Sequence, residues 1–238
     1  MTKGKQLYEG KAKIMYETGN PDELLVYYKD DATAGNGAKK GTIADKGIMN
    51  NKMTAFFFEY LEKQGIATHY VSMPSEREMV VKKLTMFPLE VVMRNVAAGS
   101  FSKRYGVEEG KVFASPTVEL FLKDDALNDP MLNSYDALAL GLATKEEIAE
   151  IERLGLKIND ILKNFLKEKK VDLIDFKLEF GKDSSGKIIL GDEISPDNCR
   201  FWDSDTHEKL DKDRFRRDLG NVEGAYKEML RRLTGEER

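Results

Sequence analysis

The 238-residue chain contains few of the residues that form disulfides and zinc sites. It has one cysteine, Cys199, and two histidines, His69 and His207. One cysteine forms no disulfide within a chain, and a zinc site built from cysteine and histidine takes about four such ligands. Any metal ion in this protein is therefore expected to be a hard cation bound by carboxylates.

Long apolar segments are absent as well. None approaches the roughly 20 apolar residues that span a bilayer, and Met1–Lys5 is not followed by the apolar core of a signal peptide. We therefore expect a cytoplasmic protein with no membrane partner. The 38 basic and 42 acidic residues give a net charge of −4, which argues against a general nucleic-acid partner but is compatible with a basic pocket for an anionic metabolite.

Short strands and one helix are predicted in the first part of the chain. The helix covers 44–63, because its apolar side chains recur at helical spacing, and Gly65 is placed to end it. The other expected segments are strands at 6–16, with a turn at Gly10, at 23–29 and at 78–84, and a glycine-bearing loop at 33–41.

The second part contains strands and longer helices. Thr144 and Glu147 form a capping box that opens a long helix. Strands are expected at 89–93, 171–181 and 187–194, and the stretch 204–233 is expected to be helical, with Gly220 between two helices.

This order of elements indicates the α+β class, because strands and helices do not alternate as regular βαβ units. The most plausible boundary between two parts of the chain lies near residue 85. We therefore predict two lobes with a cleft between them: a small, mostly antiparallel β lobe with one helix at 1–84, and a larger α+β lobe with the C-terminal helices at 85–238.

Three charged residues share one face of the strand predicted at 171–181. Asp175, Lys177 and Glu179 alternate with apolar residues, and alternate residues of a strand point to the same side. An ordinary solvated strand face would explain this pattern on its own.

The neighbouring strand favours a metal site instead. If Ser185-Gly186 is a two-residue hairpin turn, Glu179 lies opposite Asp192 with the Cβ atoms about 5 Å apart. Two negative charges at that distance repel by about 3 kcal/mol at an effective dielectric constant of ~20. We therefore predict a Mg²⁺ site at Glu179 and Asp192. The prediction depends on the register, since a slip of one residue moves Asp192 to the other face.

Basic residues mark two further candidate sites. The turn Gly10-Lys11-Ala12-Lys13 can clamp nucleotide phosphates, because glycine permits close backbone approach and the lysines supply positive charge. An exposed basic hairpin tip is the alternative. Arg94, Ser100 and Arg200 can bind a phosphate or carboxylate, and surface salt bridges are the alternative for the two arginines. A separate basic group, Lys212, Arg214, Arg216 and Arg217, is predicted to be a solvated helix face.

Two segments, 87–100 and 173–181, resemble the two signatures of the phosphoribosylaminoimidazole-succinocarboxamide synthase (SAICAR synthetase) family. Asn36 departs from the family pattern, in which some members have an aspartate. Further matching segments occur in order along essentially the whole chain, at 8–13, 129–131, 191–193, 195–197 and 211–216.

The resemblance implies a fold related to protein kinases and ATP-grasp enzymes, with ATP between the lobes. It implies that Gly10, Lys11, Ala12 and Lys13 bind the ATP phosphates and that Val81, Lys82 and Leu84 border adenine. It places Mg²⁺ at Glu179 and Asp192. It assigns substrate binding to Arg94, Ser100, Lys177 and Arg200, and catalysis to Lys13, Asp175 and Lys177.

The resemblance also implies a reaction. The family uses ATP to join the carboxylate of carboxyaminoimidazole ribonucleotide (CAIR) to the amine of L-aspartate, and a homodimer is expected. Phosphorylating a carboxylate gives an acyl phosphate that an amine can attack, which needs charge neutralisation and alignment rather than a cysteine or histidine nucleophile. The alternatives are a small-molecule kinase, which would release ADP without aspartate, and a nucleotide-sensing module, which would bind ATP without turnover.

Overall fold

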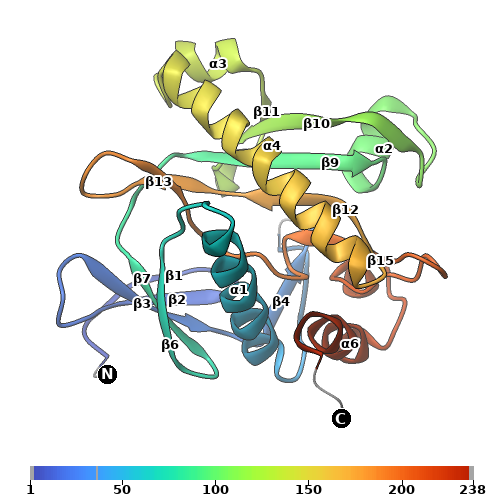
Figure 1. Cartoon of the computed structure of the whole chain (residues 1–238), viewed down its shortest axis with the longest axis horizontal. Coiled ribbons are helices and arrows are strands. Elements are labelled where there is room, and N and C mark those ends of the chain that lie inside the picture. Colours follow the sequence, from blue (N-terminus) through green and yellow to red (C-terminus); the bar gives the residue numbers. More distant parts are fainter. Residues whose placement is uncertain (1–2, 36, 236–238) are drawn as a thin grey trace.

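The computed structural model describes residues 3–35 and 37–235, so the departure at Asn36 lies outside the described residues. Over these ranges, helices are combined with antiparallel sheets (Figure 1). The predicted α+β class is confirmed. None of the helices in the described ranges has the length and apolar character needed to cross a membrane.

The first sheet is built from the N-terminal part of the chain and carries helix α1 (Lys46–Lys63) on one face. Met49, Met53, Phe57 and Leu61 recur every four residues along α1 and are buried, which explains the predicted helix. The strand order is β1 (Gln6–Glu9), β2 (Lys13–Glu17), β3 (Glu23–Tyr28), β7 (Glu78–Lys82), β6 (Tyr70–Ser75).

The second sheet carries the long helix α4 (Lys145–Glu168). The predicted capping box is present, since Thr144 accepts from the Glu147 N–H and Glu147 accepts from the Thr144 N–H. Figure 1 shows α4 lying across this sheet. The strand order is β11 (Met131–Leu132), β10 (Val112–Leu122), β9 (Leu89–Val96), β12 (Val171–Leu178), β15 (Cys199–Asp203).

Smaller elements join these two layers. A three-stranded sheet has the order β14 (Ile188–Leu190), β13 (Phe180–Lys182), β8 (Thr85–Met86), so the segment at the predicted lobe boundary pairs with a strand from the second half of the chain. The boundary itself stays a prediction. The remaining helices are α2 (Gly99–Tyr105), a 3₁₀ turn at Asp125–Leu127, α3 (Ser134–Ala139), α5 (Asp213–Arg216) and α6 (Val222–Thr234).

Three local predictions were wrong. The loop expected at 33–41 is part of a β-hairpin, β4 (Asp31–Ala34) with β5 (Lys39–Thr42), because Gly35 and Gly37 lie in a short turn between the two strands and Gly41 is itself part of β5. Only Ile188–Leu190 of the strand expected at 187–194 is extended, because the backbone turns at Asp192, which has φ 57°. Within 204–233, residues 204–212 are not helical.

Candidate functional site

A cavity of about 1160 Å³ is lined by residues from both the first sheet and the second half of the chain. Its apolar wall includes Leu24, Val26 and Met86, which suits a planar base. Every residue predicted to contact ATP or the metal lines it: Gly10, Lys11, Ala12, Lys13, Val81, Lys82, Leu84, Glu179 and Asp192.

A second cavity of about 220 Å³ is more polar. It is lined by the predicted substrate-binding residues Arg94, Ser100 and Arg200, together with Asp175. Lys177 lines both cavities. The structure therefore brings together all the predicted site residues, with Lys177 where the two cavities meet.

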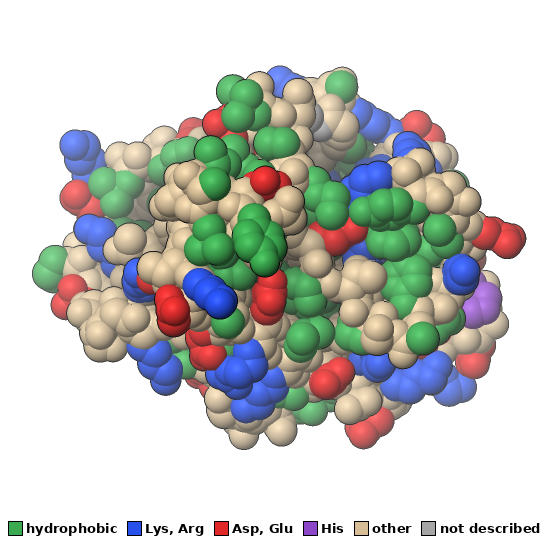
Figure 2. Space-filling view, turned by 90° about the horizontal axis from the view of Figure 1, so that it is seen from above, with side chains coloured by type: hydrophobic (Ala, Val, Ile, Leu, Met, Phe, Trp, Pro, Cys, Tyr) green, Lys and Arg blue, Asp and Glu red, His purple; other side chains and the backbone are tan. Residues whose placement is uncertain are grey.

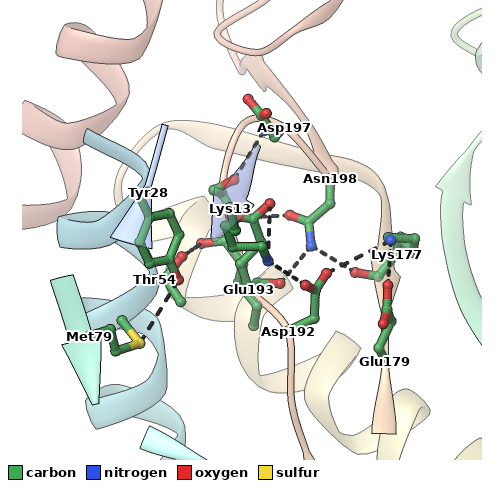
Figure 3. Close-up of polar contacts among 12 residues, drawn as sticks. Lys13, Tyr28, Thr54, Met79, Lys177, Glu179, Asp192, Glu193, Asp197 and Asn198 are labelled. Carbon is green, nitrogen blue, oxygen red and sulfur yellow. Dashed lines mark hydrogen bonds and ion pairs between the residues drawn. The ribbon is translucent and has the colours of Figure 1, made fainter. Parts of the chain in front are cut away.

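Three carboxylates surround Lys177, and Figure 3 shows two of them, Glu179 and Asp192. The Lys177 Nζ lies 2.8 Å from Glu90 Oε1, 2.7 Å from Glu179 Oε1 and 3.8 Å from Asp192 Oδ2. Burial favours the neutral amine, but the charges of Glu179, Asp192 and Glu90 outweigh it and raise the pKa of Lys177 well above its ordinary value. Lys177 is therefore a fixed positive charge.

The predicted register of the hairpin was wrong by one residue, although the two acidic residues do approach one another. Phe180 pairs with Leu190, and Glu179 accepts a backbone hydrogen bond from Gly191 rather than facing Asp192. The turn is longer than expected, since the Asp183 N–H donates to the carbonyl of Lys187. The positive φ of Asp192 then turns its side chain back into the cavity that Glu179 lines.

Lys13 lies among acidic groups on the other side of Asp192. Its ammonium forms a short ion pair with Asp192, lies 3.8 Å from Glu193 Oε1, and stands 5.8 Å from the ring centre of Tyr28. Burial alone would lower the pKa of Lys13, but the charges of Asp192 and Glu193 outweigh burial and raise it. Burial and the nearby Asp192 raise the pKa of Glu193, whose Oε2 has no hydrogen-bond donor among the described residues.

Glu179 and Asp192 suit a hard cation. Burial would raise the pKa of Asp192, but Lys13, Lys177 and Lys123 lower it below its ordinary value, so its carboxylate is charged at neutral pH. No cluster of three or more acidic, histidine or cysteine side chains that could hold a metal ion occurs in the described ranges. Mg²⁺ commonly uses one or two carboxylates with substrate phosphates, so this pair fits such an ion.

Arg94 is the centre of a buried ion-pair chain. Its Nε donates to Glu119 Oε2 at 2.8 Å, Nη1 to Asp175 Oδ2 at 2.7 Å and Nη2 to Ser100 Oγ at 3.2 Å. Its exposed fraction is 3%, and Arg104 also binds Glu119. A surface salt bridge is therefore excluded for Arg94, and its guanidinium is held rigidly at the wall of the smaller cavity.

Arg200 continues this chain. Its Nη1 donates to both oxygens of Asp175 at 3.0 and 2.9 Å, and its Nε donates to Asp213 at 2.9 Å. Asp213 in turn accepts from Arg216, which lines the smaller cavity. The prediction of a solvated basic face was wrong for Lys212, which is buried. Arg216 is exposed as predicted, although it also borders the smaller cavity.

Asp197 lies in the matching segment 195–197, but no role was predicted for it from the sequence. Lys46 Nζ lies 2.7 Å from Asp197 Oδ2, Lys212 Nζ lies 3.2 Å from the same oxygen, and Tyr226 donates to Oδ1 at 2.6 Å. Burial would raise the pKa of Asp197, but Lys46 and Lys212 lower it. One signal was available, since Lys46 begins α1, where the helix dipole disfavours a cation.

Charge on the outer surface is mixed. Figure 2 shows Lys and Arg side chains interspersed with Asp and Glu and with hydrophobic groups on the face seen from above. The strong local fields described above therefore belong to the two cavities and not to an extended surface of one sign in this view.

Comparison with known proteins agrees with this site. Residues 6–233 match the family described as SAICAR synthetase. The phosphoribosylaminoimidazole-succinocarboxamide synthase of Clostridium botulinum (strain Eklund 17B / Type B) is 58% identical over 234 residues, which cover 98% of this chain and 100% of that protein. The protein of the same name from Brevibacillus brevis is 57% identical over 236 residues, with 99% of each chain covered.

Solved structures give the same result. A SAICAR synthetase in complex with ADP has a TM-score of 0.94 and 50% identity, covering 97% of this chain and 98% of that one. The phosphoribosylaminoimidazole-succinocarboxamide synthase of Ehrlichia chaffeensis has a TM-score of 0.95 and 45% identity, covering 98% of this chain and 100% of that one. The expected fold is confirmed.

Proposed function

The chain belongs to the SAICAR synthetase family, and from this premise we propose that it uses ATP to join the carboxylate of CAIR to the amine of L-aspartate. Family membership makes it an ATP-dependent ligase of purine biosynthesis. The two substrates other than ATP, the Mg²⁺ ion, a homodimeric state and a cytoplasmic location are parts of the proposal.

One observation supports this assignment above the others: Lys177 lines both cavities. The larger cavity has the lysines and the apolar wall that a nucleoside triphosphate requires, and the smaller one has the arginines that an anionic substrate requires. A phosphoryl group transferred from the first cavity to a carboxylate in the second passes beside the Lys177 ammonium. A ligase that activates a carboxylate with ATP needs this arrangement.

Each residue of the site has a role in the proposed reaction. Lys11 and Lys13 neutralise the phosphates of ATP, and Lys177 stabilises the charge that moves during phosphoryl transfer. Mg²⁺ bound at Glu179 and Asp192 would add positive charge at the phosphate oxygens. Arg94, Ser100 and Arg200 hold the nucleotide substrate, so that its carboxylate meets the transferred phosphoryl group in line.

Asp175 acts through the arginines in this scheme. Both of its oxygens accept hydrogen bonds from Arg200, and one of them also accepts from Arg94. A carboxylate engaged in this way aligns two guanidinium groups, and the aspartate amine can then displace phosphate from an acyl phosphate without a covalent enzyme intermediate.

An ADP-release assay with each substrate omitted in turn tests the proposal. We expect rapid ADP release only when CAIR, L-aspartate and ATP are all present. Full-rate release without aspartate would identify a small-molecule kinase. Binding of ATP with no ADP formed in the complete mixture would identify a nucleotide-sensing module. Sedimentation of the purified protein tests the homodimer separately.

A further inference from the structure

The β-ladder does not by itself set the position of the two proposed metal ligands. Glu179 lies in the break between β12 and β13, and Asp192 follows the end of β14 with φ 57°. The last ladder pair is Phe180 with Leu190, and beyond it the bond from the Gly191 N–H to the Glu179 carbonyl is the only backbone–backbone hydrogen bond between the two segments among the described residues. A side-chain contact that reaches both segments would therefore add to the positioning of 191–193 against the end of β12.

The side chain of Asn198 makes that contact (Figure 3). Its Nδ2 donates to the carbonyl of Lys177 at 3.1 Å and to the carbonyl of Glu193 at 2.5 Å. Its Oδ1 accepts from the Ser195 N–H at 2.9 Å. One amide therefore bridges the strand that carries Lys177 and the segment that carries Glu193.

The backbone of Asn198 strengthens the bridge. Its carbonyl accepts from the Lys177 N–H at 2.9 Å, and its N–H donates to the Ser195 carbonyl at 3.2 Å. Both backbone polar groups of Lys177 are thus bound to one residue. Rotation of the Lys177 peptide planes would break these bonds, so the direction of the Lys177 side chain is tied to Asn198.

We propose that Asn198 is a positioning residue that sets the spacing between Glu179 and Asp192. Lys177 lies two residues before Glu179 in the chain, and Glu193 directly follows Asp192, so the two carbonyls held by Asn198 lie within two residues of the two carboxylates. Contacts of this kind outside the metal ligands commonly change metal affinity by 10–100-fold when removed. The inference rests on the proposed function, which places Mg²⁺ at this pair.

Binding of Mn²⁺, used as a spectroscopic substitute for Mg²⁺, tests the inference without an activity measurement. We expect Asn198→Ala to bind Mn²⁺ in the presence of ADP about 10-fold or more weakly than the unmodified protein. Asn198→Ser keeps a hydrogen-bond donor for one of the two carbonyls, so its affinity for Mn²⁺ should lie between those of Asn198→Ala and the unmodified protein. It also provides a readout if Asn198→Ala fails to fold.

Asn159→Ala is the matched control. Asn159 is a fully buried amide that exchanges hydrogen bonds of 2.7 and 3.0 Å with Asn95, and neither residue lines the two cavities described above. The Asn159→Ala substitution should lower thermal stability at least as much as Asn198→Ala does, and it should leave Mn²⁺ binding unchanged.

The outcomes separate the inference from its premise. If the unmodified protein with ADP binds no Mn²⁺, the metal assignment and the inference both fail. If it binds Mn²⁺ and Asn198→Ala binds equally well, only the inference fails. Mn²⁺ binding that is weakened equally in Asn159→Ala would also overturn the positioning role. An effect of Asn198→Ala that is confined to the KM of CAIR would do the same.

Discussion

Three lysine ammonium groups surround Glu179 and Asp192. Lys13 pairs with Asp192, Lys123 pairs with Glu179, and Lys177 contacts both. Glu179 is buried and Asp192 is half-buried, and two negative carboxylates near one another would repel without such partners. The lysines offset this repulsion and leave both carboxylates at the wall of the larger cavity, where they can bind a cation and its phosphate ligands.

At the scale of single residues, Glu179→Gln should lower kcat by about 100-fold or more, because the substitution removes one charged ligand at nearly constant volume. The thermal midpoint should change little, since the amide oxygen can still accept from Lys177. Steady-state kinetics and circular dichroism measure the two effects. Glu150→Gln, an exposed carboxylate paired with Arg153, is the control. Near-normal activity in Glu179→Gln would remove the metal assignment.

Arg94→Lys should raise the KM of CAIR about 10-fold and leave the KM of ATP unchanged. Lysine keeps the charge but loses the planar fork that reaches Glu119, Asp175 and Ser100 together. Arg94→Ala should also destabilise the fold by roughly 3–5 kcal/mol, because two buried carboxylates lose their partner. Kinetics with each substrate varied, together with urea unfolding, measure both effects. An unchanged KM for CAIR in Arg94→Lys would show that Arg94 is structural only.

At the scale of elements, the sequence around the β13–β14 hairpin predicted which side chains share a face but not how the two strands pair. The alternation in 171–181 correctly placed Asp175, Lys177 and Glu179, because side-chain period in a strand is local. The register was wrong because turn length depends on side-chain hydrogen bonds: Asp183 accepts from the N–H groups of Ser185 and Lys187 and widens the turn. The amino-acid sequence around Asp192 does not predict the left-handed backbone conformation of this residue.

The start of α1 lies close to the backbone of β3. Gly47 is its second residue, and its N–H donates to Asp30 at 2.9 Å. A Cβ added at Gly47 would lie 2.3 Å from the backbone oxygen of Tyr28, which cannot move as a side-chain end could. Gly47→Ala should therefore destabilise the protein by about 1–3 kcal/mol, although alanine favours helix by roughly 1 kcal/mol.

Urea unfolding of Gly47→Ala measures this loss. Gly19→Ala is the control, because an added Cβ there meets no atom within 4 Å. An increase in stability for Gly47→Ala would mean that helix propensity outweighs the close approach of α1 to β3.

At the scale of the whole molecule, the residues of contiguous motifs line the two cavities as predicted, whereas burial that depends on distant packing was not predicted. The turn at Gly10 and the segment around Arg94 carry their chemistry within a few residues. Lys46, Lys212 and Tyr226 meet at Asp197 only because α1, α5 and α6 pack around one loop. No local periodicity distinguishes such lysines from solvated ones, so their burial required the three-dimensional structure.

Asp211 is buried in the same region. We expect the ionisation of Asp211 to make the stability of the whole molecule depend on pH. Asp211 is fully buried and accepts from the N–H groups of Phe201 and Asp213 at 2.8 and 2.7 Å. Burial, and then the charge of Asp213, raise its pKa to about 7. The unfolded chain loses this proton near pH 3.9.

Between these two pKa values the folded protein binds a proton that the unfolded chain has released, so the free energy of unfolding falls as pH rises and levels off above about pH 7. The pKa difference predicts a loss of roughly 2–3 kcal/mol from pH 5 to pH 8. Asp211→Asn should remove most of this slope, whereas the exposed Asp205→Asn should retain it. Urea unfolding at pH 5, 6, 7 and 8 measures the slope, and equal slopes in Asp211→Asn and the unmodified protein would show that Asp211 is already ionised in the fold at pH 5.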